Sequence, residues 1–412
     1  MSVHRVRVAD HPGLDAQVRD IASADIVVGI LCKNVAATIL HVLNAVSQGL
    51  HQYFPAYKTV MAVTDGFSTD RTVDLAHLFQ PHNGISKIVT SDLVRGGKGG
   101  GVRTVVEIAH ELQAKSLVLL DGDLLSIRPE WLQEFSYPVL CGRADLVVPY
   151  YIRHKFDGVI TNALAYPFTR ALYGLDVRQP IAGEFGLSRE LYERMRSHPL
   201  FPADFGIDIF IVTTAAAEGM NVKEGIYSLK IHESTTRYLE PEELLVPMFR
   251  QVTGQMLEMA SHYQSHWRNH PPPHRVIAHK ECFAQNPVPV KVDLDRLRFS
   301  FQQEFAARRP VMAGLLPPEM MRQLEAVAAH GEPFTSRVWA ECVAHLTFAY
   351  LDCPEQERKE AVLEALKALW LGRFVSYAVE AAPLSMNEAE AVVQRQARIF
   401  EEVFARHRAL RD

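Results

Sequence analysis

The chain has 412 residues, 48% of them hydrophobic and 22% charged, which is typical of a globular protein long enough for two domains. Its net charge of −5 gives no reason to expect nucleic acid or an anionic membrane as a partner. The five cysteines are scattered without a C-x-x-C pair, which argues against a disulfide framework and against a cysteine zinc site. No apolar segment resembles a signal peptide or reaches membrane-spanning length, so a cytoplasmic protein is expected.

The first half of the chain alternates between strand and helix patterns. Short apolar runs predict strands, and helical periodicity follows most of them. This alternation predicts an α/β fold, Rossmann-like, with a mainly parallel sheet and helices on both faces. The expected strands are residues 25–32, 58–65, 87–91, 116–123, 145–150 and 225–231.

Long helical periodicities dominate the second half. Ser385 and Glu388 form a capping-box pattern at the start of the last of these helices. We therefore predict an N-terminal extension (1–24), an α/β domain (25–264) and a mainly helical C-terminal domain (265–412). The apolar faces of the C-terminal helices are expected to pack inside the domain, and part of them could serve a homo-oligomer interface.

The most informative stretch begins at Ser116, where an apolar run ends in two carboxylates, Asp121 and Asp123, separated by Gly122. The run predicts a strand buried on both faces, and open α/β sheets bind ligands at the carboxyl ends of such strands. Because residues i and i+2 of a strand point to the same side, both carboxylates are expected to face one site. Hard oxygen ligands suit Mg²⁺ or Mn²⁺ carried on a diphosphate, and a solvent-exposed Asp-Gly turn is the alternative.

Two further features follow neighbouring strands. Asp65 ends the second strand, where its carboxylate can accept hydrogen bonds from a base or ribose, while Ser68 or Asp70 caps the next helix. Lys98 lies in the glycine-rich run 96–101, where glycines let the backbone approach a phosphate and the lysine supplies a point charge. A flexible loop is the alternative for this run, since it matches neither the Walker nor the Rossmann spacing.

Later polar residues complete a candidate site. Glu184 follows Gly183 in a segment that is poor core and poor helix material, which favours a shaped loop near a substrate. Asp208 precedes an apolar helix, and His232 ends a predicted strand. Helix capping by Asp208 and a structural role for His232 are the alternatives.

Four histidines recur at every fourth residue, a spacing that would align them on one helix face. Three prolines interrupt the second half of this run, so one helix cannot carry all four, and we expect polar surface rather than a metal site. The histidines are His262, His266, His270 and His274.

In their order, these motifs resemble the GT-A nucleotide-sugar glycosyltransferases, and more narrowly the retaining enzymes that make mannosylglycerate, glucosylglycerate or glucosyl-3-phosphoglycerate. The resemblance rests on the first strand, T-D-G-x-S-T-D-x-T, G-K-G, D-x-D, Q-P-x-x-G-E, G-I-D and the late histidine, over about residues 26–243. It implies a GT-A-like fold and a site that binds a nucleotide-sugar.

The resemblance also implies a role for each matching residue. Asp65 and Lys98 would hold the nucleotide, Asp121 would contact the ribose, and Asp123 would coordinate the divalent metal together with His232. Gly183, Glu184 and Asp208 would line the sugar pocket. Gly122, the middle residue of the D-x-D motif, would also contact the nucleotide-sugar. An acceptor-binding stretch is implied at Arg153, Asp157 and Thr161, whose spacing would align them on one helical face with the arginine as a carboxylate fork.

The implied activity is transfer of glucose or mannose from a GDP- or UDP-hexose to D-glycerate or another small carboxylate, with retention of configuration, in the synthesis of a compatible solute. Lys98, Asp123, Glu184 and Asp208 are the residues expected to take part in catalysis. The alternatives are a glucosyl-3-phosphoglycerate synthase, an inverting transferase with Asp208 as general base, a nucleotidylyltransferase and a non-catalytic nucleotide-sugar binding protein.

Overall fold

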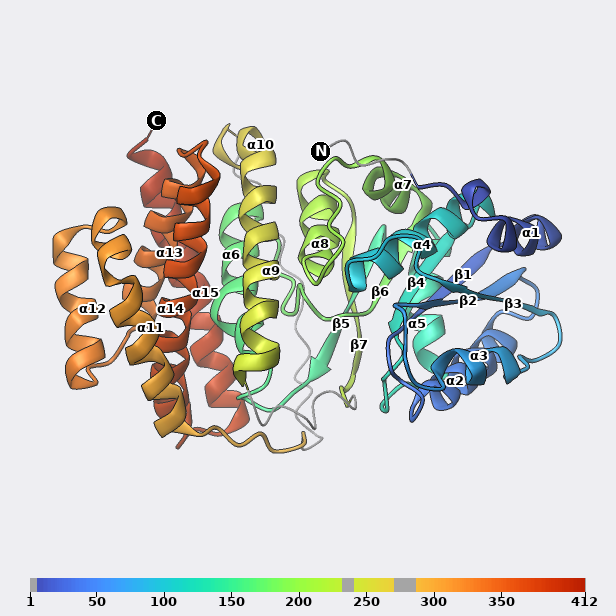
Figure 1. The fold of residues 1–412 in the computed structure, drawn as a ribbon, viewed down its shortest axis with the longest axis horizontal. Helices are drawn as coiled ribbons and strands as arrows, with labels where there is room; N and C mark the ends of the chain where they lie inside the picture. Colours follow the sequence, from blue (N-terminus) through green and yellow to red (C-terminus); the bar gives the residue numbers. More distant parts are fainter. Residues whose placement is uncertain (1–5, 232–240, 270–286, 412) are drawn as a thin grey trace. The chain divides into compact units, whose positions relative to one another are not determined.

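The computed structural model describes residues 6–231, 241–269 and 287–411 (Figure 1). Contacts divide the chain into two compact units. Unit 1 comprises residues 1–152 and 181–241, and unit 2 comprises residues 153–180 and 242–412. The chain therefore leaves unit 1 after its fifth strand and returns to it before the sixth.

Unit 1 is built on a seven-stranded sheet with the order β3-β2-β1-β4-β6-β5-β7. Every pair is parallel except those of β6, which runs antiparallel to β4 and β5. This confirms the predicted mainly parallel sheet. The strands are β1 (Ile26–Cys32), β2 (Thr59–Asp65), β3 (Ile85–Ser91), β4 (Ser116–Asp121), β5 (Leu146–Ile152), β6 (Phe185–Ser188) and β7 (Val222–Leu229).

The central strands are buried along most of their length, with mainly apolar residues, because helices cover both faces. At Gly29 in β1 an added Cβ would lie 2.5 Å from a methyl group of Val105, so glycine is what allows the covering helix to approach this strand. The register pairs Cys32 with Asp65 and Leu31 with Asp121. The polar ends of β2 and β4 therefore reach the same edge of the sheet.

Helices α4, α7 and α8 lie on one side of this sheet, and α2, α3 and α5 lie on the other (Figure 1). Chain order and bounds are η1 (Val8–Asp10), α1 (Pro12–Ile21), α2 (Ile39–Tyr53), α3 (Thr72–Leu78), α4 (Lys98–Glu111), α5 (Glu130–Leu140), α7 (Arg189–Ser197) and α8 (Ile207–Ala217). Gly99, Gly100 and Gly101 belong to α4, so much of the run expected to be a loop is helix.

Unit 2 is helical in its described part. Its core includes Trp339, whose indole N–H donates to the carbonyl of Ala163 at 2.7 Å, and Trp370, which stacks on Phe249. The helices are η2 (a π-helix, Thr161–Ala165), α6 (Tyr166–Tyr173), α9 (Pro241–His262), α10 (Gln264–Asn269), α11 (Leu294–Leu315), α12 (Pro318–His330), α13 (Ser336–Leu351), α14 (Gln356–Ala381) and α15 (Met386–Ala409).

The capping box predicted at Ser385 and Glu388 is present at the start of α15. The units differ from the expected domain boundaries in two places, because residues 153–180 and 242–264 pack with the C-terminal helices. Within the described residues, no helix combines the length and apolarity that crossing a bilayer requires.

Candidate functional site

A lysine and two carboxylates form the centre of the candidate site in unit 1. Lys98 opens α4, Asp121 ends β4 and Asp208 lies in the first turn of α8. The Lys98 Nζ lies 3.0 Å from Asp121 Oδ1 and 3.2 Å from Asp208 Oδ1, and it donates a hydrogen bond to the carbonyl of Gly183 at 2.9 Å. Four predicted site residues are thus brought together by one ammonium group.

Gly183 is required by the shape of this cluster. Its φ of +102° lies in a region that L side chains rarely adopt. A Cβ at this position would lie 2.9 Å from the Nζ of Lys230, 3.0 Å from Asp121 Oδ2 and 3.4 Å from the Nζ of Lys98. The glycine therefore lets the backbone turn in the middle of three charged groups.

A second, deeper ion pair joins the next residue, Glu184, to Lys230, which directly follows β7. Glu184 is fully buried, and the Nζ of Lys230 lies 3.0 and 2.9 Å from its two carboxylate oxygens. The Tyr151 hydroxyl also donates to Glu184 Oε2 at 2.8 Å. Sequence reasoning missed Lys230 and Tyr151. The available signal was a lysine near the end of the predicted strand 225–231, two residues before His232.

The electrostatics of the cluster follow from burial and from these pairings. Burial alone would raise the pKa of Asp121, but the charges of Lys98 and Lys230 lower it below its usual value. Burial alone would lower the pKa of Lys98, but the charges of Asp121 and Asp208 raise it. Burial raises the pKa of Asp208, against the influence of Lys98. Burial also raises the pKa of Glu184 to about 7, partly offset by Lys230. The carboxylates therefore differ in how readily each one ionises.

Asp123 lies outside the strand on which it was expected. β4 ends at Asp121, and residues 122–123 form a turn, so strand alternation does not orient the second carboxylate. The turn is tight because Gly122 donates to the carbonyl of Leu31 at 2.8 Å, and an added Cβ would lie 2.9 Å from Cys32 Sγ. Asp123 is partly exposed at this edge of the sheet.

The donor set of this edge fits a hard divalent cation such as Mg²⁺ or Mn²⁺. Asp121 and Asp123 offer carboxylate oxygens within three residues, and Asp121 is held in its ionised form by the neighbouring lysines. His232, the other predicted ligand, lies outside the described residues.

The end of β2 offers an acceptor of a different kind. Asp65 is 4% exposed, and its Oδ2 accepts from the backbone N–H of Ser68 at 2.9 Å. Within the described part of the chain its Oδ1 has no hydrogen-bond partner, which suits a donor on a ligand. Burial and the charge of Asp65 raise the pKa of the adjacent Asp92 to about 7.

Asp70 accepts a hydrogen bond from the Thr72 amide at the start of α3, as predicted.

The glycines around Lys98 serve packing rather than an open phosphate loop. The N–H groups of Gly99 and Gly100 donate to the carbonyls of Asp204 and Ala203 at 3.2 and 3.0 Å. An added Cβ on Gly99 would lie 2.2 Å from the carbonyl oxygen of Pro202. These amides are therefore engaged within the protein, and the lysine side chain is what the segment contributes to the site.

The predicted acceptor residues all belong to the first segment of unit 2, residues 153–180. They do not form the expected helical series. Residues 153–158 form a turn in which Gly158 has φ of +65°, and η2 begins at Thr161. An added Cβ on Gly158 would lie 3.3 Å from Arg153 Nη1 and 3.8 Å from Thr161 Oγ1. The turn thus gathers Arg153 and Thr161, while Asp157 Oδ1 accepts from the Gly158 amide.

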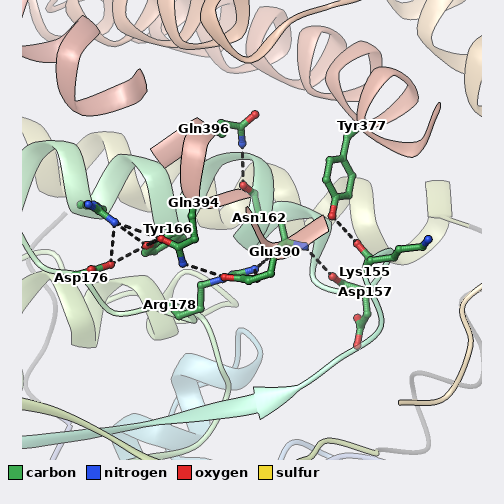
Figure 2. A network of polar contacts seen from close by, with 11 residues as sticks. Lys155, Asp157, Asn162, Tyr166, Asp176, Arg178, Tyr377, Glu390, Gln394 and Gln396 are labelled. Atoms are coloured by element: carbon green, nitrogen blue, oxygen red, sulfur yellow. Dashed lines mark hydrogen bonds and ion pairs between the residues drawn. The ribbon is translucent and has the colours of Figure 1, made fainter. Parts of the chain in front are cut away.

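Figure 2 shows how this segment is held in unit 2. The Tyr377 hydroxyl of α14 donates to the carbonyl of Lys155 at 3.0 Å. Arg178 binds Glu390 of α15 with two hydrogen bonds of 2.8 Å. The segment is therefore fixed at both ends by the C-terminal helices, which rigid positioning of an acceptor would require.

The histidine run does not share one helix. His262 ends α9, and His266 lies on the separate helix α10. His270 and His274 lie outside the described residues.

No family model and no curated protein sequence matches this chain. Its structure is similar to solved structures of glucosyl-3-phosphoglycerate synthase from Mycobacterium tuberculosis. The complex with Mn²⁺, uridine diphosphate and glucosyl-3-phosphoglycerate has 25% identity and a TM-score of 0.47, covering 59% of this chain and 82% of the other. The complex with Mn²⁺, UDP-glucose and phosphoglyceric acid has 24% identity and a TM-score of 0.47, covering 67% and 90%.

A third structure of the same enzyme, with Mn²⁺, UDP-glucose and glycerol 3-phosphate, has 24% identity and a TM-score of 0.44, covering 60% and 83%. Because each TM-score lies below 0.5, the activity has to be argued from the residues of the site.

Proposed function

We propose that the protein is a metal-dependent retaining glycosyltransferase that moves a hexose from a nucleotide-diphosphate sugar to a hydroxyl of a small carboxylate such as D-glycerate. The observation that carries the proposal is the cluster of Lys98, Asp121, Gly183 and Asp208 at the carboxyl edge of the sheet, with Asp123 beside it. Such an edge is where open α/β sheets bind nucleotides.

The nucleotide would be held by acceptors that the protein leaves available. Asp65 offers its Oδ1 to an N–H or O–H donor of the base or ribose. Asp121, kept ionised by its lysines, would accept from a ribose hydroxyl. Lys98 contributes positive charge on this side of the site, but it is shared with two carboxylates, so we assign it a role in orienting Asp121 and Asp208 as well.

Asp123, with His232 as a further ligand, would hold Mg²⁺ or Mn²⁺, which supplies Lewis-acid stabilisation of the leaving diphosphate. The remaining task of the protein is to bind and orient the hexose. Glu184 and Asp208 are suited to hydrogen-bond sugar hydroxyls, because each carboxylate is fixed by a lysine. Both oxygens of Glu184 are already bonded to Lys230, which argues against attack by this carboxylate on the anomeric carbon.

The proposed reaction therefore proceeds without a covalent enzyme intermediate. The acceptor hydroxyl oxygen forms the new bond to the anomeric carbon, and the bond from that carbon to the diphosphate oxygen breaks. The proton of the hydroxyl passes to the departing phosphate oxygen, and the nucleoside diphosphate leaves. Attack on the same face as the leaving group retains the anomeric configuration.

The acceptor is proposed to bind to the turn at Arg153. A guanidinium can pair with a carboxylate through two parallel hydrogen bonds, which favours a carboxylate acceptor such as glycerate or its 3-phosphate. Asp157 and Thr161 would bind its hydroxyl groups.

The test is to incubate the protein with UDP-glucose, GDP-glucose or GDP-mannose, Mg²⁺ or Mn²⁺, and D-glycerate or 3-phosphoglycerate, and to identify both products. Release of nucleoside diphosphate and retained configuration in the NMR spectrum of the product support the proposal. Asp123→Ala is expected to abolish turnover, whereas Asp74→Ala, which removes an exposed carboxylate from α3, should not affect it.

Other outcomes contradict the proposal in identifiable ways. Release of pyrophosphate would identify a nucleotidylyltransferase, and an inverted product would assign Asp208 as a general base. Donor binding without turnover across this panel would indicate a binding protein. Full activity in excess chelator would remove the role of the metal.

A further inference from the structure

Unit 2 contains a cluster of three side chains that the proposed reaction does not use. Glu341 and His345 lie four residues apart on α13, so both project from the same face of that helix. His407 lies in the last turn of α15, which packs against α13. One ligand atom from each of the three side chains lies within 4.8 Å of the other two.

The cluster is largely shielded and its members are in direct contact. His407 Nε2 lies 3.0 Å from Glu341 Oε2, and these side chains are only 11% and 16% exposed. The rings of His345 and His407 lie 4.6 Å apart and nearly perpendicular, at 86°. The ring of Phe348 is stacked nearly parallel to the His407 imidazole at 5.9 Å. Packing therefore holds the two imidazoles next to one carboxylate.

We propose that Glu341, His345 and His407 bind Zn²⁺ and join α13 to α15. Two imidazole nitrogens and one carboxylate oxygen are a donor set that zinc accepts in tetrahedral geometry, with water in the fourth position. Mg²⁺ and Mn²⁺ prefer oxygen ligands, so this site is chemically distinct from the D-x-D edge and independent of the proposed transferase activity. Tetrahedral ligand atoms 2.0 Å from zinc lie about 3.3 Å apart. The ligand atoms of the three side chains lie within 4.8 Å of one another here, so side-chain rotation has to bring them closer together when zinc binds.

An arginine of the protein competes with a metal for this site. Arg406 forms an ion pair with Glu341 Oε1, and its side chain is 55% exposed. The guanidinium can therefore move into solvent when a metal takes the carboxylate. A protein that lacks this arginine should bind zinc more tightly, because Glu341 then has one competitor fewer.

The experiment is calorimetric titration of the full chain with Zn²⁺ in excess Mg²⁺, using an Asp123→Ala background to remove the other candidate metal site. We expect one zinc per chain. His345→Ala or His407→Ala should weaken binding at least about a hundredfold, since each removes a ligand. The matched control is His330→Ala, which removes an exposed histidine at the end of α12. Arg406→Ala should strengthen binding.

Two further measurements guard against misfolded variants and against zinc bound elsewhere. His345→Gln keeps most of the side-chain volume, and its melting temperature in chelator should match that of the His330→Ala control. A hundredfold excess of zinc over its dissociation constant should raise the melting temperature by roughly 3 °C in the parent protein and not in His345→Gln. Co²⁺ in place of zinc should give the visible absorption of a tetrahedral site.

The proposal is overturned if the parent protein binds no zinc in this titration, in which case the three residues form a hydrogen-bonded packing contact only. It is equally overturned if zinc binds but His345→Gln and His407→Ala bind it as tightly as the His330→Ala control.

Discussion

Gly183→Ala tests whether the turn between Lys98, Asp121 and Lys230 organises the candidate site. The backbone φ of +102° makes any L side chain strained there, which costs about 1–3 kcal/mol. The added methyl group would also lie 2.9 Å from the Nζ of Lys230, closer than real Cβ contacts, and 3.0 Å from Asp121 Oδ2, which is unusually tight. The ion pairs must therefore shift by several tenths of an ångström.

A displacement of about 1 Å in a preorganised site can lower a rate about a hundredfold. We therefore expect Gly183→Ala to lower kcat/KM by about tenfold to a hundredfold, measured as nucleoside diphosphate release. The matched control is Gly219→Ala. Gly219 also has a positive φ, +70°, but nothing lies within 4 Å of an added Cβ. The control should lose about 1–2 kcal/mol of stability and keep its activity.

The comparison separates strain from disruption of the cluster. Melting temperatures measure the strain common to both variants, and the rates measure what only Gly183→Ala disturbs. If Gly183→Ala turns over as fast as Gly219→Ala, the charged groups do not depend on this turn, and the assignment of the cluster as the reaction site is refuted.

Three further predictions concern other parts of the site. Burial raises the pKa of Asp92 to about 7 from an ordinary value of 3.8, so the folded protein loses stability as pH rises from about 4 to 7 and this carboxyl group ionises. Asp92→Asn should therefore melt at a higher temperature than the parent protein at pH 8. The difference in melting temperature should disappear near pH 4. Lys230→Met leaves the fully buried Glu184 without its cation, which should lower the free energy of unfolding by about 3–5 kcal/mol in chemical denaturation. The same change should shift the pH–rate profile to higher pH. An unchanged profile would remove Glu184 from the reaction. Arg153→Ala should raise KM for the acceptor at least tenfold with little effect on donor affinity, whereas equal losses for both substrates would end its assignment as an acceptor ligand.

The predictable part of the fold was the part that repeats a local pattern. β1, β2 and β4 each have an apolar centre because both faces of a parallel sheet are covered, and this pattern is visible in the sequence alone. The grouping of polar residues at one edge followed, because parallel strands end together. Asp121 was predicted for this reason, and it is in contact with Lys98, which also contacts Gly183 and Asp208, residues that loop composition and the family resemblance had indicated.

The rest depended on contacts between distant segments or on single backbone angles. Lys230, the residue after β7, lies 46 residues beyond Glu184 in the sequence, and no local pattern indicates their ion pair. The predicted strand ended two residues too late, at Asp123, because β4 stops at Asp121 and the chain then turns. The helical series from Arg153 failed because the chain turns at Gly158, whose positive φ is incompatible with a continuous helix.

The excursion of residues 153–180 has a consequence for synthesis on the ribosome. The polypeptide emerges with β1 to β5 first, then with a segment whose partners, such as Tyr377 and Glu390, are translated some two hundred residues later. β6 and β7, which complete the sheet, emerge in between. The nascent chain must therefore keep this segment unpaired while the first unit closes, and removing the C-terminal helices at residue 241 would expose it permanently.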